Sequence, residues 1–296
     1  MEKEAIQNKE KNFVSCVLYL HNDGKNIREF LKTVCGTMEQ NFEKYEIVCV
    51  NDCCMDDTIE EIHRYLEESN TRHVVSLINL SFYQGVEMAM NAGRDLAVGD
   101  FLFEFDRCLL DFEPSLIMDI YHKALEGYDV VAAAPKRDVA FTSRLFYAVY
   151  NLGSRNTHKL RQERFRIISR RAVNRVNQMN AYIPYRKAMY MNCGLRAETI
   201  VYDNKEMAKG TRNREERNTR SSLALDTLII FTDVLEKLSM LISSILFAVM
   251  VIMFGWIVYS IFSTVRPVEG WMSLMTLISF GFFIGDIGQQ FFLRHN

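Results

Sequence analysis

Three carboxylates follow a short apolar run, at the point where a buried strand would end. Glu104, Asp106 and Asp111 lie in the stretch LFEFDRCLLDFEP, residues 102–114. If the strand continues through Glu104 and Asp106, their side chains point to the same face. Carboxylates placed in this way hold charged ligands, and hard divalent cations prefer such oxygen ligands. Cys108 stands between the two aspartates, and a thiolate is a poor ligand for Mg²⁺. Three interpretations are therefore open: a working metal site, an altered one, or a loop without this chemistry.

The elements that must position these residues alternate along the first 135 residues. Short apolar, β-rich runs occupy 13–20, 45–50, 74–80, 101–105 and 129–134. Between them the apolar residues take helical spacing, with Asn22 as an expected N-cap and Pro114 at the start of a later helix. Strands that alternate with helices of this length indicate βαβ units. We therefore expect an α/β fold with a mostly parallel sheet.

Ligands of such sheets bind at the carboxyl ends of the strands, so the polar residues that follow each strand are the site candidates. Acidic groups follow the first, second and fourth runs, and basic groups follow the fifth. This combination suits a phosphate-bearing ligand, with or without a divalent cation. The candidates are His21, Asn22, Asp23, Asn51, Asp52, Ser81, Tyr83, Gln84, Asp106, Cys108, Asp111, Lys136 and Arg137.

A basic stretch covers residues 136–175, with eleven Lys and Arg against Asp138 and Glu163. Aromatic residues are interleaved with these charges, a pattern that also occurs in nucleic-acid-binding segments. Contact with phosphates at a lipid surface is the preferred interpretation, because an apolar C-terminal region follows. A solvated helix face is the remaining alternative.

The C-terminal region is apolar enough to enter a membrane. Residues 238–262 contain no Asp, Glu, Lys or Arg over 25 positions, and 271–293 form a second apolar run. About 20 apolar residues suffice for a membrane-spanning helix, so we expect a two-helix transmembrane hairpin. The basic segment 204–220 and Arg294 place both ends on the cytoplasmic side. Residues 221–237 are amphipathic and are expected to lie along the interface.

The beginning of the chain and its cysteines agree with a cytoplasmic setting. Residues 1–12 are polar and charged, with no apolar core of a signal peptide. None of the seven cysteines shows C-x-x-C spacing, and no cysteine and histidine array fits a zinc module. We therefore expect reduced thiols.

Five segments in order resemble a known family. They are FVSCVLYLHNDGKNI (13–27), YEIVCVNDCCMDDT (45–58), LINLSFYQGVEMAMNAGRDLAVGD (77–100), FDRCLLDFEP (105–114) and RFRIISRRAV (164–173). Together with the C-terminal spans, they resemble the family 2 glycosyltransferases that load a sugar onto a polyprenyl phosphate, such as dolichyl-phosphate mannose synthase and bacterial undecaprenyl-phosphate sugar transferases. The resemblance implies a GT-A-type domain at 1–220, an interfacial helix at 221–237 and the hairpin at 238–293.

The resemblance also implies a nucleotide site and names its residues. Asn22 keeps the family residue, and Asp23 replaces a glutamate that borders the nucleotide pocket. Asp52 is expected to contact the base, while Ser81 belongs to a retained Leu-Ser pair. Asp106 completes the nucleotide-binding set.

The sequence departs from the family pattern at three important positions. Cys53 replaces a glycine, Val86 replaces a lysine, and Cys108 replaces the second aspartate of an Asp-x-Asp pair. Asp106 is the first aspartate of that pair. The resemblance therefore implies Mg²⁺ or Mn²⁺ as cofactor, with Asp106, Cys108 and Glu104 as the candidate ligands.

The remaining roles concern catalysis and the acceptor. The resemblance implies Asp106, Asp111 and Arg166 as catalytic residues. Arg137, Arg144 and Arg166 are the candidates for binding the acceptor phosphate, which suits bidentate arginine. In 182–195, Tyr185, Arg186 and Asn192 are polar candidates for contact with the sugar or the acceptor.

The expected function is transfer of a sugar from a nucleotide diphosphate sugar, with UDP favoured, to undecaprenyl phosphate for cell-envelope polysaccharide assembly. Direct displacement by the phosphate implies inversion. The expected location is a bacterial cytoplasmic (inner) membrane with a cytoplasmic catalytic domain, no nucleic-acid partner and a homo-oligomer through the hairpin as an option. Two alternatives remain: a scaffold subunit that has lost turnover, and a transferase that acts on a lipid-linked glycan.

Overall fold

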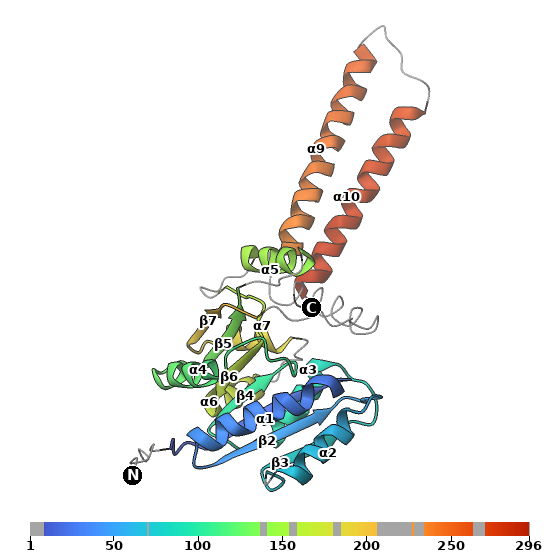
Figure 1. Ribbon diagram of the computed structural model, residues 1–296. Helices are drawn as coiled ribbons and strands as arrows, with labels where there is room; N and C mark the ends of the chain where they lie inside the picture. Colours follow the sequence, from blue (N-terminus) through green and yellow to red (C-terminus); the bar gives the residue numbers. More distant parts are fainter. Residues whose placement is uncertain are drawn as a thin grey trace, which may run out of the picture. The chain divides into compact units, whose positions relative to one another are not determined.

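The computed structural model describes residues 9–69, 71–136, 141–153, 159–179, 185–205, 227, 234–262 and 270–295. The chain divides into two compact units, Met1–Asn151 with Asn156–Thr227, and Leu152–Arg155 with Leu228–Asn296. The first unit holds the sheet and its helices, and the second holds the two C-terminal helices (Figure 1).

A seven-stranded sheet with the order β3-β2-β1-β4-β6-β5-β7 organises the first unit. Its strands are β1 (Val14–Leu20), β2 (Tyr45–Asn51), β3 (Val75–Asn79), β4 (Phe101–Phe105), β5 (Val130–Pro135), β6 (Phe165–Ser169) and β7 (Ala197–Tyr202). Only β6 among these strands is antiparallel to its neighbours, β4 and β5. The prediction of a mostly parallel α/β sheet is confirmed.

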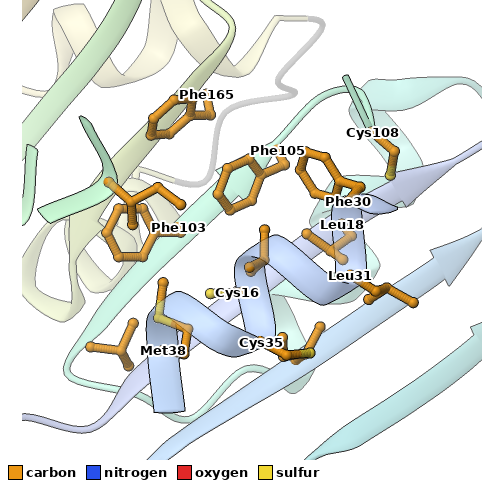
Figure 2. Close-up of a cluster of buried hydrophobic side chains, with 14 of the residues drawn as sticks. Cys16, Leu18, Phe30, Leu31, Cys35, Met38, Phe103, Phe105, Cys108 and Phe165 are labelled. Carbon is orange, nitrogen blue, oxygen red and sulfur yellow. The ribbon is translucent and has the colours of Figure 1, made fainter. Parts of the chain in front are cut away.

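Helices connect the strands along the chain (Figure 1). They are α1 (Gly24–Asn41), α2 (Thr58–Glu68), α3 (Val86–Leu96), α4 (Ser115–Leu125), α5 (Phe141–Gly153), α6 (Arg170–Gln178) and α7 (Arg186–Asn192). The main hydrophobic core lies between the sheet and α1, α2 and α4. Phe30 of α1 packs edge-on against Phe105, at 5.3 Å between ring centroids, and Phe165 stacks on Phe105 at 4.9 Å (Figure 2).

Helix α3 covers the opposite face of the sheet. At Gly93 of α3, an added Cβ would lie 2.4 Å from Val17 and 2.7 Å from Val50, so only glycine permits this close approach. Because successive side chains of a strand point to opposite faces of the sheet, Phe103 and Phe105 of β4 face α1 and Glu104 faces α3.

The local expectations at the first loop need a correction. Asn22 does not cap α1, because the helix begins after Asp23 and Asn22 has a φ of +59°. The helix itself follows the expected spacing, since Ile27, Phe30 and Leu31 are all buried.

The second unit consists of α9 (Val234–Phe262) and α10 (Trp271–His295). The segment Lys237–Ser260 of α9 is the one stretch in the described part of the chain that is long and apolar enough to cross a membrane. The apolar segment of α10, Ser273–Gly285, is shorter. The two helices pack against each other, with Phe247 and Phe283 at 5.4 Å between ring centroids. The two-span hairpin stays a prediction, and most of the expected interfacial segment, 221–237, lies outside the described residues.

Candidate active site

Glu104 and Arg166 form the centre of the candidate site. They are direct partners across the antiparallel β4–β6 pair, and both side chains are almost completely buried. Nη1 of Arg166 donates to Glu104 at 2.6 Å, Nη2 donates to Asp106 at 2.9 Å, and Nε donates to Glu163 at 2.9 Å. Three carboxylates therefore surround one buried guanidinium.

A second guanidinium, that of Arg186, meets the same carboxylates from α7. Its Nη1 donates to Glu104 at 2.7 Å and its Nη2 to Asp106 at 2.8 Å. Its Nε and its main-chain N–H both donate to Glu87 on α3, at 2.9 and 3.0 Å. Arg186 thus joins α7, α3 and β4.

Further side chains complete this arrangement. The Tyr190 hydroxyl donates to Glu104 at 2.7 Å and accepts from Arg94 at 3.1 Å. The ammonium of Lys187 lies 3.5 Å from Asp106. We call the charged members of this group the Asp106 ion cluster. They are Glu87, Arg94, Glu104, Asp106, Glu163, Arg166, Arg186 and Lys187.

The arginines of the cluster favour the ionised forms of Asp106 and Glu104. Burial would raise the pKa of Asp106, but the charges of Arg166 and Arg186 outweigh it and hold the pKa well below its usual range. The pKa of Glu104 is also lowered, because its desolvation is outweighed by Arg186, Arg166 and Arg94. Neither carboxyl group is poised to act as a general acid.

Cys108 does not share a site with Asp106. Its thiol lies 3.6 Å from the main-chain oxygen of Tyr19 and is 1% exposed. Figure 2 places Cys108 in the hydrophobic cluster beside Phe30 and Leu18, on the α1 side of the sheet. Burial raises the pKa of this thiol well above its ordinary value, so the metal-binding thiolate is disfavoured.

Asp111 belongs to a separate buried ion pair. Both of its oxygens accept from Nε of Arg164, at 3.0 and 2.9 Å, and the Tyr202 hydroxyl adds a bond at 3.0 Å. The main-chain oxygen of Asp111 accepts from Lys205. Asp111 therefore fastens the loop after β4 to β6 and to the end of β7. Its catalytic role stays a prediction.

Asp52 is buried at the end of β2, where it organises the start of α3. Its carboxylate accepts from the Tyr19 hydroxyl at 2.9 Å and from the main-chain N–H groups of Gln84 and Gly85, at 2.7 and 2.8 Å. Its main-chain oxygen lies 2.7 Å from Nδ1 of His21. A carboxylate is favoured at the N-terminus of a helix by the helix dipole. Contact between Asp52 and a base stays a prediction.

The β1–α1 and β2–α2 loops are joined by a set of hydrogen bonds. The Asn22 side chain accepts from the N–H of Met55 at 2.8 Å, and the N–H of Asp23 donates to Thr58 at 2.8 Å. Gly24 donates to Asp56 at 3.0 Å. Burial raises the pKa of Asp23 to about 6. The loops thus bring Asn22 and Asp23 into one polar region beside Asp52.

The other predicted residues are placed differently. Ser81 is exposed in the loop after β3. Arg144 is exposed on α5, while Arg137 lies outside the described residues. Arg166 is 0% exposed and takes part in three ion pairs. The structure therefore does not bring Arg144 and Arg166 together at an exposed surface, and their roles toward the acceptor stay predictions.

The described residues offer no group of three or more His, Cys, Asp and Glu side chains that could hold a metal ion. Each oxygen of Asp106 is taken by a different arginine, and Glu104 is fully buried among two arginines and a tyrosine. Because Cys108 lies across the sheet, the donor set predicted from the sequence does not fit Mg²⁺ or Mn²⁺ in this arrangement.

The sequence similarity of this chain to curated proteins is broad but low in identity. It is 25% identical over 275 residues to an uncharacterized glycosyltransferase of Synechocystis sp., covering 90% of this chain and 84% of the relative. Over a shorter stretch of 119 residues it is 30% identical to the undecaprenyl-phosphate 4-deoxy-4-formamido-L-arabinose transferase of Pseudomonas syringae, covering 40% of this chain and 34% of that protein.

Solved structures share the fold at still lower identity. A mannosyltransferase of Pyrobaculum calidifontis, solved with GDP-Man and Mn²⁺, matches with a TM-score of 0.54 and 16% identity, covering 74% of this chain and 64% of that chain. Glucosyl-3-phosphoglycerate synthase of Mycobacterium tuberculosis, solved with Mn²⁺, UDP and phosphoglyceric acid, matches with a TM-score of 0.53 and 14% identity, covering 74% of this chain and 78% of that chain. These matches confirm the GT-A-like fold.

A family model decides the assignment. The model described as glycosyl transferase family 2 matches residues 15–192, which hold β1 from its second residue, the strands β2–β6 and the whole Asp106 ion cluster. The chain therefore belongs to glycosyl transferase family 2.

Proposed function

We propose that this protein transfers a sugar from a nucleotide diphosphate sugar, with UDP as the favoured nucleotide, to undecaprenyl phosphate. The observation that carries the proposal is the presence, in one chain, of a family 2 glycosyltransferase region at 15–192 and of an apolar helix segment, Lys237–Ser260, long enough to cross a membrane. A membrane-anchored glycosyltransferase is suited to a lipid acceptor. The local similarity to an undecaprenyl-phosphate sugar transferase supports the same acceptor class.

The loops after β1, β2 and β3 are the proposed nucleotide site. Asn22, Asp23 and Ser81 lie in these loops, at the carboxyl ends of neighbouring parallel strands. His21 and Tyr83 lie there as well, with their ring centroids 4.7 Å apart. Aromatic rings and polar main-chain groups at such an edge suit a base and a ribose.

The transfer is a direct displacement. An oxygen of the lipid phosphate forms the new bond to the anomeric carbon, and the bond from that carbon to the donor diphosphate breaks, with its electron pair leaving on the nucleoside diphosphate. A lipid phosphate is already ionised at neutral pH, so no general base has to remove a proton from it. This accords with the lowered pKa of Asp106. One displacement inverts the anomeric centre.

The proposed location is a bacterial cytoplasmic membrane with the sheet-bearing unit in the cytoplasm. The acceptor candidates are Arg137, Arg144 and Arg166. Arg144 is the best of the three for a test, because its side chain is exposed on α5 and the described structure gives it no ion pair.

The full-length protein should be purified in detergent and mixed with undecaprenyl phosphate and UDP-glucose, UDP-galactose, UDP-N-acetylglucosamine or GDP-mannose, with EDTA or with Mn²⁺. The expected product is a glycosylated lipid phosphate with inverted anomeric configuration, detected by mass spectrometry and by the coupling constant of the anomeric proton. Arg144→Ala should raise KM for the lipid. Arg171→Ala is the matched control, because Arg171 is 69% exposed and paired with Asp129.

Other outcomes favour the alternatives. Transfer only to a lipid that already carries a sugar would indicate a transferase that extends a lipid-linked glycan. No transfer from any donor to either acceptor would contradict the proposed function and favour a scaffold subunit. The buried, fully paired carboxylates of the Asp106 ion cluster are the observation that motivates this second candidate.

A further inference from the structure

The formal charges of the Asp106 ion cluster sum to zero. It contains four carboxylates and four cationic side chains. The acidic members are Glu87, Glu104, Asp106 and Glu163, and the basic members are Arg94, Arg166, Arg186 and Lys187. A metal site built from aspartates has an excess of negative charge that a divalent cation neutralises. This cluster has no such excess, so a divalent cation at Asp106 would be repelled by the neighbouring guanidinium and ammonium groups.

The coordination geometry leads to the same conclusion. Oδ1 of Asp106 accepts from Arg186 at 2.8 Å, and Oδ2 accepts from Arg166 at 2.9 Å. Both arginines are 1% exposed at their side chains, and each makes contacts with two further carboxylates. To bind a metal, Asp106 would have to lose one of these charge-assisted bonds, and a buried arginine would lose one of its partners.

The residue that replaces the second aspartate offers no alternative ligand. Cys108 is 1% exposed and packs with Phe30 and Leu18 on the other face of the sheet (Figure 2). The second aspartate of the family pattern is absent at position 108, and Arg186 binds the carboxylate of the first, Asp106. These are two independent observations on the same site.

Lys187 is the cation of the cluster with the longest polar contacts. Its ammonium is 3.5 Å from Asp106 and 3.4 Å from the main-chain oxygen of Glu163, and both contacts are longer than those of the arginines. Its side chain is 9% exposed and that of Asp106 is 14% exposed, whereas those of Arg166 and Arg186 are 1% exposed. A flexible lysine at this position can turn from Asp106 to a phosphate oxygen while Asp106 keeps its bonds to Arg166 and Arg186.

We propose that this protein binds its sugar nucleotide without a divalent cation, with Arg186 in the place of the metal at Asp106 and Lys187 as the cation that contacts the donor diphosphate. The role of Lys187 rests on the proposed function, whereas the replacement of the metal by Arg186 concerns Asp106 alone. The leaving nucleoside diphosphate would then be stabilised by fixed side-chain charge.

Manganese binding tests the first part. Mn²⁺ is titrated into the full-length protein and into Asp106→Asn, with and without UDP or GDP, and free Mn²⁺ is measured by electron paramagnetic resonance. We expect no retention of Mn²⁺ that depends on Asp106 in either condition. Retention by the unchanged protein that Asp106→Asn abolishes would overturn the proposal. The test uses no variant of a buried arginine, so it does not depend on whether such a variant folds.

Nucleotide binding tests the second part. The dissociation constants of UDP, GDP, uridine and guanosine are measured by calorimetry in EDTA and in Mn²⁺. We expect the unchanged protein to bind UDP or GDP in EDTA with an affinity within about 2-fold of that in Mn²⁺. Lys187→Met should bind the diphosphate at least about 10-fold more weakly, while its affinity for the nucleoside stays the same. Arg171→Met is the control and should leave all affinities unchanged.

The two failures can be told apart. If the diphosphate binds only with Mn²⁺, the proposal that the nucleotide binds without a divalent cation is overturned. If Lys187→Met binds the diphosphate as tightly as the unchanged protein, the proposed role of Lys187 is overturned. In both cases sugar transfer can still be measured. If no nucleotide binds in any condition, the role of Lys187 and the proposed function both fail, and the manganese titration still decides whether Asp106 is a metal ligand.

Discussion

Glu104 and Arg166 lie opposite each other in the β4–β6 pair, and the guanidinium of Arg166 is 2.6 Å from the Glu104 carboxylate with both side chains out of contact with water. Arg166 also donates to Asp106 and Glu163, so one guanidinium bonds to three carboxylates. A buried ion pair of this kind adds little net stability relative to apolar residues of the same volume. The loss of one partner is costly, because an uncompensated charge stays in the interior.

Arg166→Met should therefore lower the free energy of unfolding by about 3–5 kcal/mol. The measurement is chemical denaturation of the full-length protein in detergent, followed by circular dichroism. Arg171→Met is the matched control, because Arg171 is exposed and its buried partner Asp129 keeps the hydrogen bond from Ser169, so the loss should be about 1 kcal/mol or less. An equal loss in the two variants would show that the buried cluster is not an electrostatic unit.

A second prediction concerns restoration of the family residue at position 108. In a metal site that merely lacks its second ligand, Cys108→Asp would restore the cation. The structure gives the opposite expectation, because the new carboxylate would lie in the apolar cluster with Phe30 and Leu18. An uncompensated buried carboxylate costs several kcal/mol or stays protonated.

Cys108→Asp should thus destabilise the protein by about 3 kcal/mol or more without any Mn²⁺-dependent rise in its melting temperature. Cys108→Ala is the control for the lost packing and should cost about 1–2 kcal/mol. The prediction fails if Mn²⁺ stabilises Cys108→Asp and not Cys108→Ala.

The pKa of Asp23 gives a third prediction, on pH dependence. Burial raises this pKa from 3.8 to about 6. At a pH between these two values, Asp23 is therefore protonated in the folded protein and ionised in the unfolded chain. The contribution of Asp23 to stability therefore falls as the pH rises through this window, and the penalty is complete above about pH 6.

Asp23→Asn removes this penalty and keeps a side-chain oxygen for the N–H of His21, which donates to Asp23 at 3.1 Å. At pH 7 the variant should be more stable than the unchanged protein by about 1–2 kcal/mol, after allowance for partial exposure. Near pH 4 the two should be equally stable. Melting curves across this range measure the difference, and a constant offset at every pH would mean that Asp23 does not titrate as described.

The sequence predicted the parallel part of the fold and the positions of its acidic residues, because hydrophobic periodicity and strand ends depend on local spacing. Strand alternation predicts Glu104 on the same face as Asp106, and both accept from Arg166 and Arg186. The family resemblance implies that Arg186 lies near the sugar or the acceptor. The sequence alone could not pair it with Asp106, because the two residues are 80 positions apart.

The side to which Cys108 turns also depends on tertiary structure. The Asp-x-Asp pattern implied that positions 106 and 108 share a site, but the loop after β4 directs Cys108 into the core beneath α1. Many arginines of the basic stretch likewise have internal partners. Arg164 pairs with Asp111, and Arg170 donates to the carbonyl groups of Ala97 and Gly99. Composition does not distinguish such arginines from those that face a lipid.

The last prediction concerns the backbone at Cys53, the position where the family pattern has glycine. Cys53 keeps the positive φ, at +57°, which costs an L-residue about 1–2 kcal/mol. Asn22 shares this conformation at +59°, but asparagine tolerates it, and its side chain accepts a hydrogen bond from Met55.

Cys53→Gly should relieve the strain at Cys53 and stabilise the protein by about 0.5–1 kcal/mol, since the greater freedom of glycine in the unfolded chain offsets part of the gain. Cys54→Gly is the matched control. Cys54 has no positive φ, and its sulfur accepts from the N–H of Asn22 at 3.3 Å, so this variant should be destabilised. A higher melting temperature for Cys53→Gly and a lower one for Cys54→Gly would confirm strain at Cys53. A lower melting temperature for both variants would show that the Cys53 side chain stabilises the fold by more than its strained backbone destabilises it.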